Sequence, residues 1–119
     1  MRLLFILLLC ISSLQAQKLE VGTNKPYKTI KQALKASRVG DTVLVYKGIY
    51  KEGNLRIDKK IVFLGKDFPV LDGQKKEEVL SIHADSVVVK GFRVINSGFA
   101  ALEDPCGIKV YNKSFVLIE

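Results

Sequence analysis

The stretch YKTIKQALKASRVGDTVLVYKGIYKE, residues 27–52, contains three patterns in succession. Within residues 30–34 the apolar side chains are spaced i, i+3, i+4, which is typical of the buried face of a short helix. After Gly40 the pattern changes to a β-branched and apolar strand, residues 42–46, and Gly48 then marks a corner. A docked helix, a buried strand and a corner in this order predict the capped entrance of a parallel β-helix.

The predicted helix follows Pro26, with Thr29 as its N-cap, and we expect it to end at Gly40. A helix this short is stable only when its apolar face docks on another element. The polar residues 17–25 before it predict an irregular segment or an edge strand. The outer face of the helix carries Lys28, Lys31, Gln32 and Lys35.

The rest of the chain predicts short strands with Gly, Asp, Asn or Lys at nearly every corner, and no longer helix. Leu55 and Ile57 alternate with Arg56, and Asp72-Gly73 closes the run that starts at Pro69. The other strands are expected at residues 42–46, 49–50, 61–64, 79–82, 87–89, 92–96, 107–111 and 115–118.

Three of these segments, residues 59–65, 85–91 and 112–118, resemble one another. Their first apolar residues, at positions 61, 87 and 115, are 26 and 28 residues apart. A period of this length built from short strands predicts a solenoid, whose stacked coils pair their backbones and pack like residues on like. We therefore expect an all-β fold, a right-handed parallel β-helix with a short N-terminal capping helix. The expected inward side chains are Val43, Val45, Ile61, Phe63, Val87, Val89, Phe92, Val94, Ile108, Val110, Phe115 and Leu117.

A small β-sandwich is the alternative architecture, because it also uses many short strands. The unequal loops, the single N-terminal helix and the similarity between coils favour the solenoid. Residues 115–119 are strand-like, and an open solenoid end exposes unpaired backbone and apolar interior. We therefore expect a C-terminally incomplete solenoid, either the N-terminal part of a longer protein or a truncated reading frame.

The beginning of the chain predicts a secretory signal peptide, residues 1–16. It has Arg2, an apolar run Leu3–Ile11 and a small residue at a plausible cleavage point. Nine apolar residues are too few to cross a bilayer as a helix, which takes about 20, although an uncleaved anchor is the alternative. Lipidation of Cys10 is not expected, because a large residue precedes it. Residues 17–119 then form one domain, the cap and first coils, in the periplasm.

The formal net charge of the chain is +7. Without residues 1–16 it has 18 basic and 12 acidic residues, a net charge of +6. The lysines are scattered and are not interleaved with aromatic residues, so we do not expect nucleic-acid binding. They predict a solvated outer face, or contact with an acidic partner or an anionic membrane surface.

Few residues in the exported part carry catalytic or metal-binding chemistry. Copper prefers thiolate, thioether and imidazole ligands, and this part has one histidine, His83, and one cysteine, Cys106, about one coil apart. Two ligands without a third make an incomplete copper site. The alternative is that His83 is a turn residue and Cys106 is buried. Residues 99–105 interrupt the repeat. They form either a binding loop or a variable insertion that has no function of its own. Turn chemistry explains the corner carboxylates Asp41, Asp58, Asp67, Asp72 and Asp85. We assign no catalytic residue and leave cofactor and metal sites unknown.

The helix and residues 40–52 resemble the entrance shared by many right-handed β-helix proteins, including pectin methylesterases and polysaccharide lyases. The later segments resemble NosD, a periplasmic β-helix protein of nitrous oxide reductase maturation, and this resemblance covers residues 26–119. It is carried by Val70–Gly73, Ile82–Phe92, Val94–Gly98 and Gly107–Asn112.

The resemblance implies a non-enzymatic accessory protein that works with an ABC transporter in delivering copper or sulfur to the multicopper centre of the reductase. The copper would belong to the full-length family, because residues 17–119 do not supply a full set of ligands. The alternative is an exported β-helix that binds or degrades polysaccharide. The aspartate-rich and glutamine-rich motifs of pectin methylesterases are not present.

Overall fold

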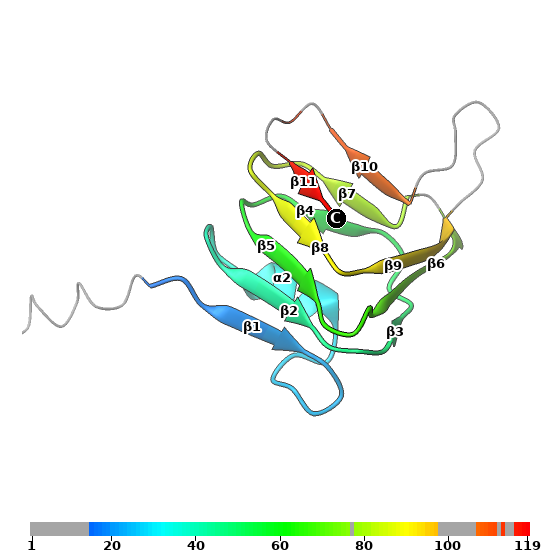
Figure 1. The fold of residues 1–119 in the computed structure, drawn as a ribbon, viewed down its shortest axis with the longest axis horizontal. Helices are drawn as coiled ribbons and strands as arrows, with labels where there is room; N and C mark the ends of the chain where they lie inside the picture. Colours follow the sequence, from blue (N-terminus) through cyan, green and yellow to red (C-terminus); the bar gives the residue numbers. More distant parts are fainter. Residues whose placement is uncertain (1–14, 77, 98–106, 112, 114–115) are drawn as a thin grey trace, which may run out of the picture.

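The computed structural model describes residues 15–76, 78–97, 107–111, 113 and 116–119, and it confirms the all-β parallel β-helix. The chain makes about three turns, each crossing three sheets in the same order (Figure 1). Sheet A contains β1 (Lys18–Val21), β2 (Thr42–Val45), β5 (Val62–Gly65), β8 (Val88–Lys90) and β11 (Leu117–Ile118). Sheet B contains β3 (Ile49–Tyr50), β6 (Val70–Lys76) and β9 (Arg93–Ser97). Sheet C contains β4 (Leu55–Ile57), β7 (Leu80–Ile82) and β10 (Ile108–Val110).

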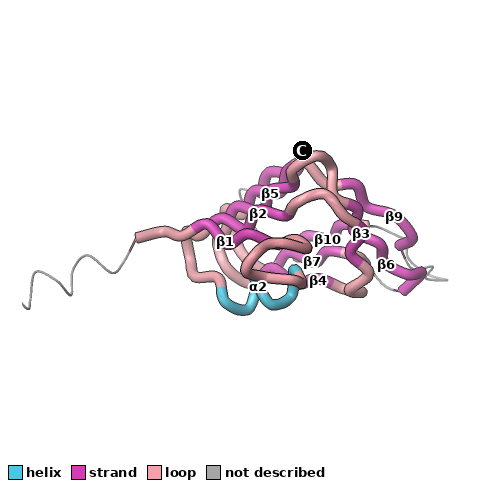
Figure 2. The backbone as a smooth tube through the Cα atoms, turned by 90° about the horizontal axis from the view of Figure 1, so that it is seen from below, coloured by secondary structure: helices cyan, strands magenta, loops and turns pink. Residues whose placement is uncertain are grey.

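Every strand pair is parallel, so each coil repeats the path of the one below it. Seen along the stack, the three sheets enclose the interior as walls (Figure 2). Among the described residues the buried core is aliphatic except for Phe63, which is its largest fully buried side chain. The ring of Phe63 stacks on Phe92 at 4.3 Å between centroids, which joins one coil to the next through the interior.

The helix α2 (Ile30–Ala36) packs on β1, β2 and β4. It buries Ile30, Ala33 and Leu34, as its spacing predicts. Thr29 is confirmed as the N-cap and forms a capping box with Gln32. The predicted end at Gly40 is wrong: the helix ends at Ala36, and an extended Ser37 caps it.

A long-range contact completes the N-terminus of α2. The carboxylate of Glu52 accepts hydrogen bonds from the backbone N–H of Ile30 at 2.8 Å and of Lys31 at 3.0 Å. These N–H groups have no partner inside the helix, so an acidic side chain from the turn after β3 satisfies both. Glu52, the last residue of the stretch 27–52, therefore caps the N-terminus of the helix in the same stretch.

The residues before α2 form β1, so the edge-strand alternative is confirmed for that segment. The predicted closure at Asp72-Gly73 is wrong, because β6 continues to Lys76 with a register shift in its pairing with β9. Asp72 is buried at this shift, and its Oδ1 accepts hydrogen bonds from the Gln74 N–H at 2.9 Å and from Asn96 Nδ2 at 3.1 Å. These bonds stabilise the irregularity that lets the strand continue.

The predicted inward positions are confirmed for the first coils. The side chains of Val43, Val45, Ile61, Phe63, Val87 and Val89 are all buried, and Phe92, Val94 and Ile108 pack against them.

The last coil is different. Leu117 pairs with Val88 and is 49% exposed, so its predicted inward orientation is wrong. Val116 packs against the core instead. Leu117 on β11 lies 29 residues after its partner Val88, one more than the predicted step of 28, and a shift of one residue moves every side chain to the other face. Val110 lies in register with buried Ile82 but is itself 37% exposed. Phe115, also expected inward, lies outside the described residues.

Candidate binding face on sheet C

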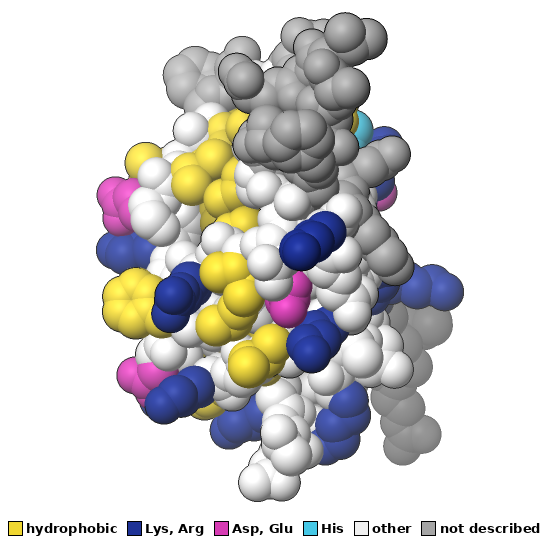
Figure 3. All heavy atoms as spheres, turned by 90° about the vertical axis from the view of Figure 1, so that its right-hand side faces the viewer, with side chains coloured by type: hydrophobic (Ala, Val, Ile, Leu, Met, Phe, Trp, Pro, Cys, Tyr) yellow, Lys and Arg dark blue, Asp and Glu magenta, His cyan; other side chains and the backbone are white. Residues whose placement is uncertain are grey.

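The outer face of sheet C carries several polar side chains that bond to one another across coils. The outer face of sheet A has an aliphatic centre, with Leu44, Val62, Leu64 and Val88 all partly exposed, and charged side chains on β1 and at the end of β8. From the side of sheet B, Figure 3 shows a column of hydrophobic side chains flanked by Lys and Arg. Ile49 on β3 and Val70 on β6 are in register on that sheet, and Ile49 is 67% exposed. Sheet C is therefore the face on which we build a candidate site.

Two rows of side chains follow from the pairing of the three strands. Arg56, Ser81 and Lys109 are in register on β4, β7 and β10. Each of these strands is followed by a second polar residue, and these are Asp58, His83 and Tyr111. Because residues two apart on a strand point to the same side, His83 and Tyr111 share the outer face with Ser81 and Lys109. Leu55 and Ile57 fill the core.

Asn54 links the lower two coils at the edge of this face. Its Nδ2 donates to Ser81 Oγ at 2.7 Å and to the Glu78 carbonyl at 2.8 Å. The Ser81 hydroxyl also makes a 3.0 Å contact to Asn54 Oδ1. Ser81 is only 2% exposed, so the exposed amide of Asn54 covers a buried hydroxyl and satisfies it.

An aromatic stack lies over the upper two coils. The rings of His83 and Tyr111 are 4.3 Å apart between centroids and 10° from parallel. Lys109 Nζ lies 5.0 Å from the centroid of the Tyr111 ring, within cation–π range. The Tyr111 hydroxyl donates to the carboxylate of Glu78. This hydrogen bond lowers the pKa of Glu78 and raises the pKa of Tyr111, because it stabilises the charged carboxylate and the neutral phenol.

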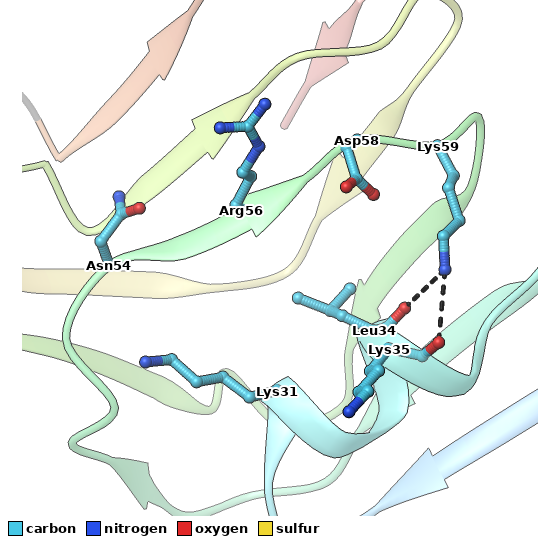
Figure 4. Close-up of a pocket in the computed structure, with 7 residues that line it drawn as sticks. All are labelled: Lys31, Leu34, Lys35, Asn54, Arg56, Asp58 and Lys59. Atoms are coloured by element: carbon cyan, nitrogen blue, oxygen red, sulfur yellow. Dashed lines mark hydrogen bonds between the residues drawn. The ribbon is translucent and has the colours of Figure 1, made fainter.

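A hollow of about 350 Å³ lies below this face, between β4 and α2 (Figure 4). Lys31 and Lys35 line it from the helix, with Leu34 between them, and Asp58 points into it from the end of β4. Arg56 also lines it, but its side chain points away from α2 over the outer face of the sheet.

Lys59 closes one end of the hollow. Its ammonium donates to the carbonyls of Leu34, Lys35 and Ser37, at 3.1, 3.4 and 2.6 Å. These carbonyls lie at the C-terminus of α2, where a cation is favourable. The Lys59 ammonium therefore caps the C-terminus of α2. Lys31 and Lys35 are the exposed cations that line the hollow from the helix.

The structure describes only some of the residues that the sequence predicted as candidates. His83 stacks on Tyr111, and Cys106 lies outside the described residues, so the proposed pair stays a prediction. Asp41 is 3% exposed and accepts from the backbone N–H of Gln17 and Arg38, both at 2.8 Å, as a corner residue should. Among the described residues, no group of three or more His, Cys, Asp or Glu side chains could hold a metal ion. Residues 99–105 also lie outside the description.

Sequence reasoning did not single out Asn54, Glu78 or Tyr111 as parts of one face. They are 24 and 33 residues apart along the chain, and only the register of sheet C brings them together. The spacing of the repeats was the available signal, but the number of residues between paired strands differs between β4–β7 and β7–β10. Leu55 pairs with Leu80, and Leu80 pairs with Ile108.

Fold and site together define a parallel β-helix of short coils, with a helix at its first coil and a polar outer face on one sheet. Comparisons with protein-family models, with curated proteins and with solved structures each found no match to this chain. The part of the chain that the structure describes has no helix long and apolar enough to cross a membrane.

Proposed function

We propose that this chain serves as a non-enzymatic periplasmic accessory protein of the NosD type. In that role it acts with an ABC transporter in maturing the copper centre of nitrous oxide reductase. The carrying observation is that two of the segments resembling NosD occupy corresponding places in successive coils. Residues 70–73 and 94–97 lie on the paired strands β6 and β9, and Asp72 accepts a hydrogen bond from Asn96 between them.

The remaining segments of the resemblance lie on sheets C and A. Residues 82–92 run from the end of β7 through β8, and residues 107–111 contain β10, which pairs with β7. The resemblance therefore follows the repeat of the solenoid and is not limited to one corner. A solenoid offers continuous outer faces for docking to other proteins, and this supports an accessory role.

Deletion of the gene in its own host tests the proposal. We expect the deletion strain to make normal amounts of nitrous oxide reductase polypeptide that lacks its multicopper centre and does not consume nitrous oxide. A plasmid copy of the gene should restore both copper content and activity. A fully loaded, active reductase in the deletion strain, or a host without such a reductase, would refute the proposal.

The second candidate is binding of polysaccharide, and the outer face of sheet C favours it. Aromatic rings together with a few fixed polar groups are typical of small-molecule sites. Here the Tyr111 ring lies near Lys109, and Asn54 and Arg56 occupy the same face. In affinity electrophoresis through polygalacturonate, the protein should be retarded, and Tyr111→Ala should remove the retardation. Phe68→Ala is the matched control, because Phe68 is 70% exposed in the turn before β6. Equal retardation of both variants, or none for the parent, contradicts this candidate.

A further inference from the structure

The outer face of sheet B carries apolar side chains that stand out from the surface. Ile49 on β3 is 67% exposed, and Phe68, in the turn before β6, is 70% exposed. Val70 on β6 is in register with Ile49, lies two residues after Phe68 and is partly exposed. Figure 3 shows hydrophobic side chains on this side of the molecule with Lys and Arg beside them. We call Ile49, Phe68 and Val70 the sheet B patch.

The turn that presents Phe68 is fixed by its neighbours. Pro69, the next residue, is buried, and the N–H of Val70 donates to the Gly48 carbonyl at 2.8 Å. Phe68 has a φ of +52°, a left-handed conformation that is unfavourable for a bulky residue. Because its ring is exposed, packing within the fold does not offset this strain. A contact outside the protein is the remaining way in which the ring can be buried.

Cations border the sheet B patch. Lys47 lies two residues before Ile49, and Lys51 lies two residues after it. Arg93 on β9 is in register with Val70. All three cations are exposed, and none of them forms an ion pair with a described residue. Their charges are therefore available to a partner.

The carboxylates near the patch offset only part of this charge. Within two residues of the patch in sequence, or in register with it, the chain has four cations and two carboxylates. The fourth cation is Lys66, and the carboxylates are Asp67 and Asp72. Asp72 is buried and accepts hydrogen bonds from Gln74 and Asn96, so only Asp67 of the two is exposed. The surroundings of the patch are therefore net positive, which favours an anionic partner.

The small size of the patch favours a membrane over a folded protein as that partner. A stable protein interface buries about 800 Å² on each side around a closely packed apolar centre. Three side chains, two of which stand out from the surface, supply only a small part of such an area. A bilayer needs no matching shape, because apolar side chains enter the boundary between headgroups and acyl chains while neighbouring cations attract anionic lipids.

We propose that the sheet B patch docks this protein on a membrane surface that contains anionic lipid. Phe68 and Ile49 enter the headgroup region, and Lys47, Lys51 and Arg93 contact lipid phosphates. The apolar side chains and the cations are each too few for stable binding, and together they give reversible attachment. The inference goes beyond the maturation role and does not depend on it.

Sedimentation with lipid vesicles tests the proposal on the full-length exported protein. One set of vesicles contains phosphatidylcholine and phosphatidylglycerol, and the other contains phosphatidylcholine alone. We expect binding to the mixed vesicles only, and weaker binding as salt is added, because salt screens exposed charges. Absence of binding to the mixed vesicles, or equal binding to both sets, would overturn the proposal.

The apolar contact is tested by Phe68→Ala, which should weaken binding to the mixed vesicles about tenfold. Val39→Ala is the matched control, because Val39 is also 70% exposed but lies in the turn before β2, outside the patch. The control should bind within about twofold of the parent. Far-UV circular dichroism and the urea midpoint check that each variant is folded. Unchanged binding by a folded Phe68→Ala overturns the proposal.

The charges are tested by Lys47→Gln/Lys51→Gln, which should weaken binding about tenfold. Lys31→Gln/Lys35→Gln is the matched control, because it removes the same charge from exposed positions on α2. The control should bind within about threefold of the parent, since only its long-range attraction is lost. Equal weakening by both double variants would contradict docking through the sheet B patch.

A tryptophan reporter measures insertion directly. The chain contains no tryptophan, so Phe68→Trp introduces a single indole. We expect its emission to shift to the blue when mixed vesicles are added, and to be quenched by lipids with brominated acyl chains. Val39→Trp should show neither change. If Phe68→Trp sediments with the vesicles and its emission is unaffected, the ring does not insert and the proposal is wrong.

Other occupants of the patch would give different results. A dimer that dissociates in Phe68→Ala, without binding to vesicles, would overturn the proposal and assign the patch to a second copy. Binding of polyglutamate without binding to vesicles would likewise assign it to an acidic protein. None of these outcomes affects the gene-deletion test of the maturation role, because that test measures copper loading of the reductase.

Discussion

Replacement of Gly65 by alanine tests the close stacking of the coils. Gly65 is the last residue of β5, and a Cβ atom added to it would lie 2.4 Å from the carbonyl oxygen of Gly91 and 2.8 Å from Pro69 Cδ. Real Cβ atoms essentially never approach other atoms within 3.0 Å, so the corner must open by at least 0.6 Å. Stacked strands are only about 4.8 Å apart, and neither a carbonyl nor a proline ring can rotate out of the way.

Overpacking of this kind costs about 1–3 kcal/mol, and we expect Gly65→Ala near the upper limit, about 3 kcal/mol. For a domain of this size each kcal/mol lowers the melting temperature by about 4–8 °C, so the midpoint should fall by about 12–24 °C. Urea unfolding and thermal melting followed by circular dichroism measure both quantities.

Gly40→Ala is the control for Gly65→Ala. Gly40 has a φ of +91°, which L-residues rarely adopt, but a Cβ atom there meets nothing within 4 Å. Its substitution should therefore cost only the backbone strain, about 1 kcal/mol. If Gly65→Ala is no less stable than Gly40→Ala, the tight contact between the two corners is refuted.

Three further variants test other parts of the fold by urea unfolding. Glu52→Ala should lose about 1–2 kcal/mol, because the first N–H groups of α2 lose their acceptor; an unchanged midpoint would contradict the long-range cap. Asp41→Asn should be less stable than the parent at neutral pH. Two backbone hydrogen bonds lower the pKa of Asp41 in the folded state. Its contribution is therefore complete above the unfolded pKa of about 4 and is lost as the pH falls through the folded pKa. A deficit that does not shrink in acid would refute this assignment. Phe63→Ala should cost about 3–5 kcal/mol because Phe63 is fully buried, whereas Phe68→Ala, which is 70% exposed, should stay within about 0.5 kcal/mol. Similar losses for the two would contradict the core.

The sequence alone was sufficient for the architecture. A repeat of about 26 residues, short apolar strands and corner residues predict stacked coils, because one coil cannot bury its apolar side by itself. The N-cap at Thr29 and the buried positions of α2 were also predictable, since both depend on spacings of three and four residues within one helix. Inward residues such as Val43 and Phe63 follow from alternation along a single strand.

The tertiary structure decided everything that depends on how far one coil is shifted against the next. The step from β8 to β11 is one residue longer than the predicted 28, which places Leu117 outward and Val116 inward, and no local pattern indicates this difference. Glu52 caps a helix that starts 22 residues before it, because the turn after β3 returns to the start of α2.

The polar face of sheet C depends on this register in the same way. Asn54, Ser81 and Tyr111 contribute to it from separate coils, each in a stretch whose own sequence indicates only a strand or a turn. Alternation and helical periodicity are local and can be read along the chain. The length of each coil is set by packing between coils. The stretch 27–52 therefore specifies the kind of solenoid. Only the assembled coils specify which side chains meet on its surface.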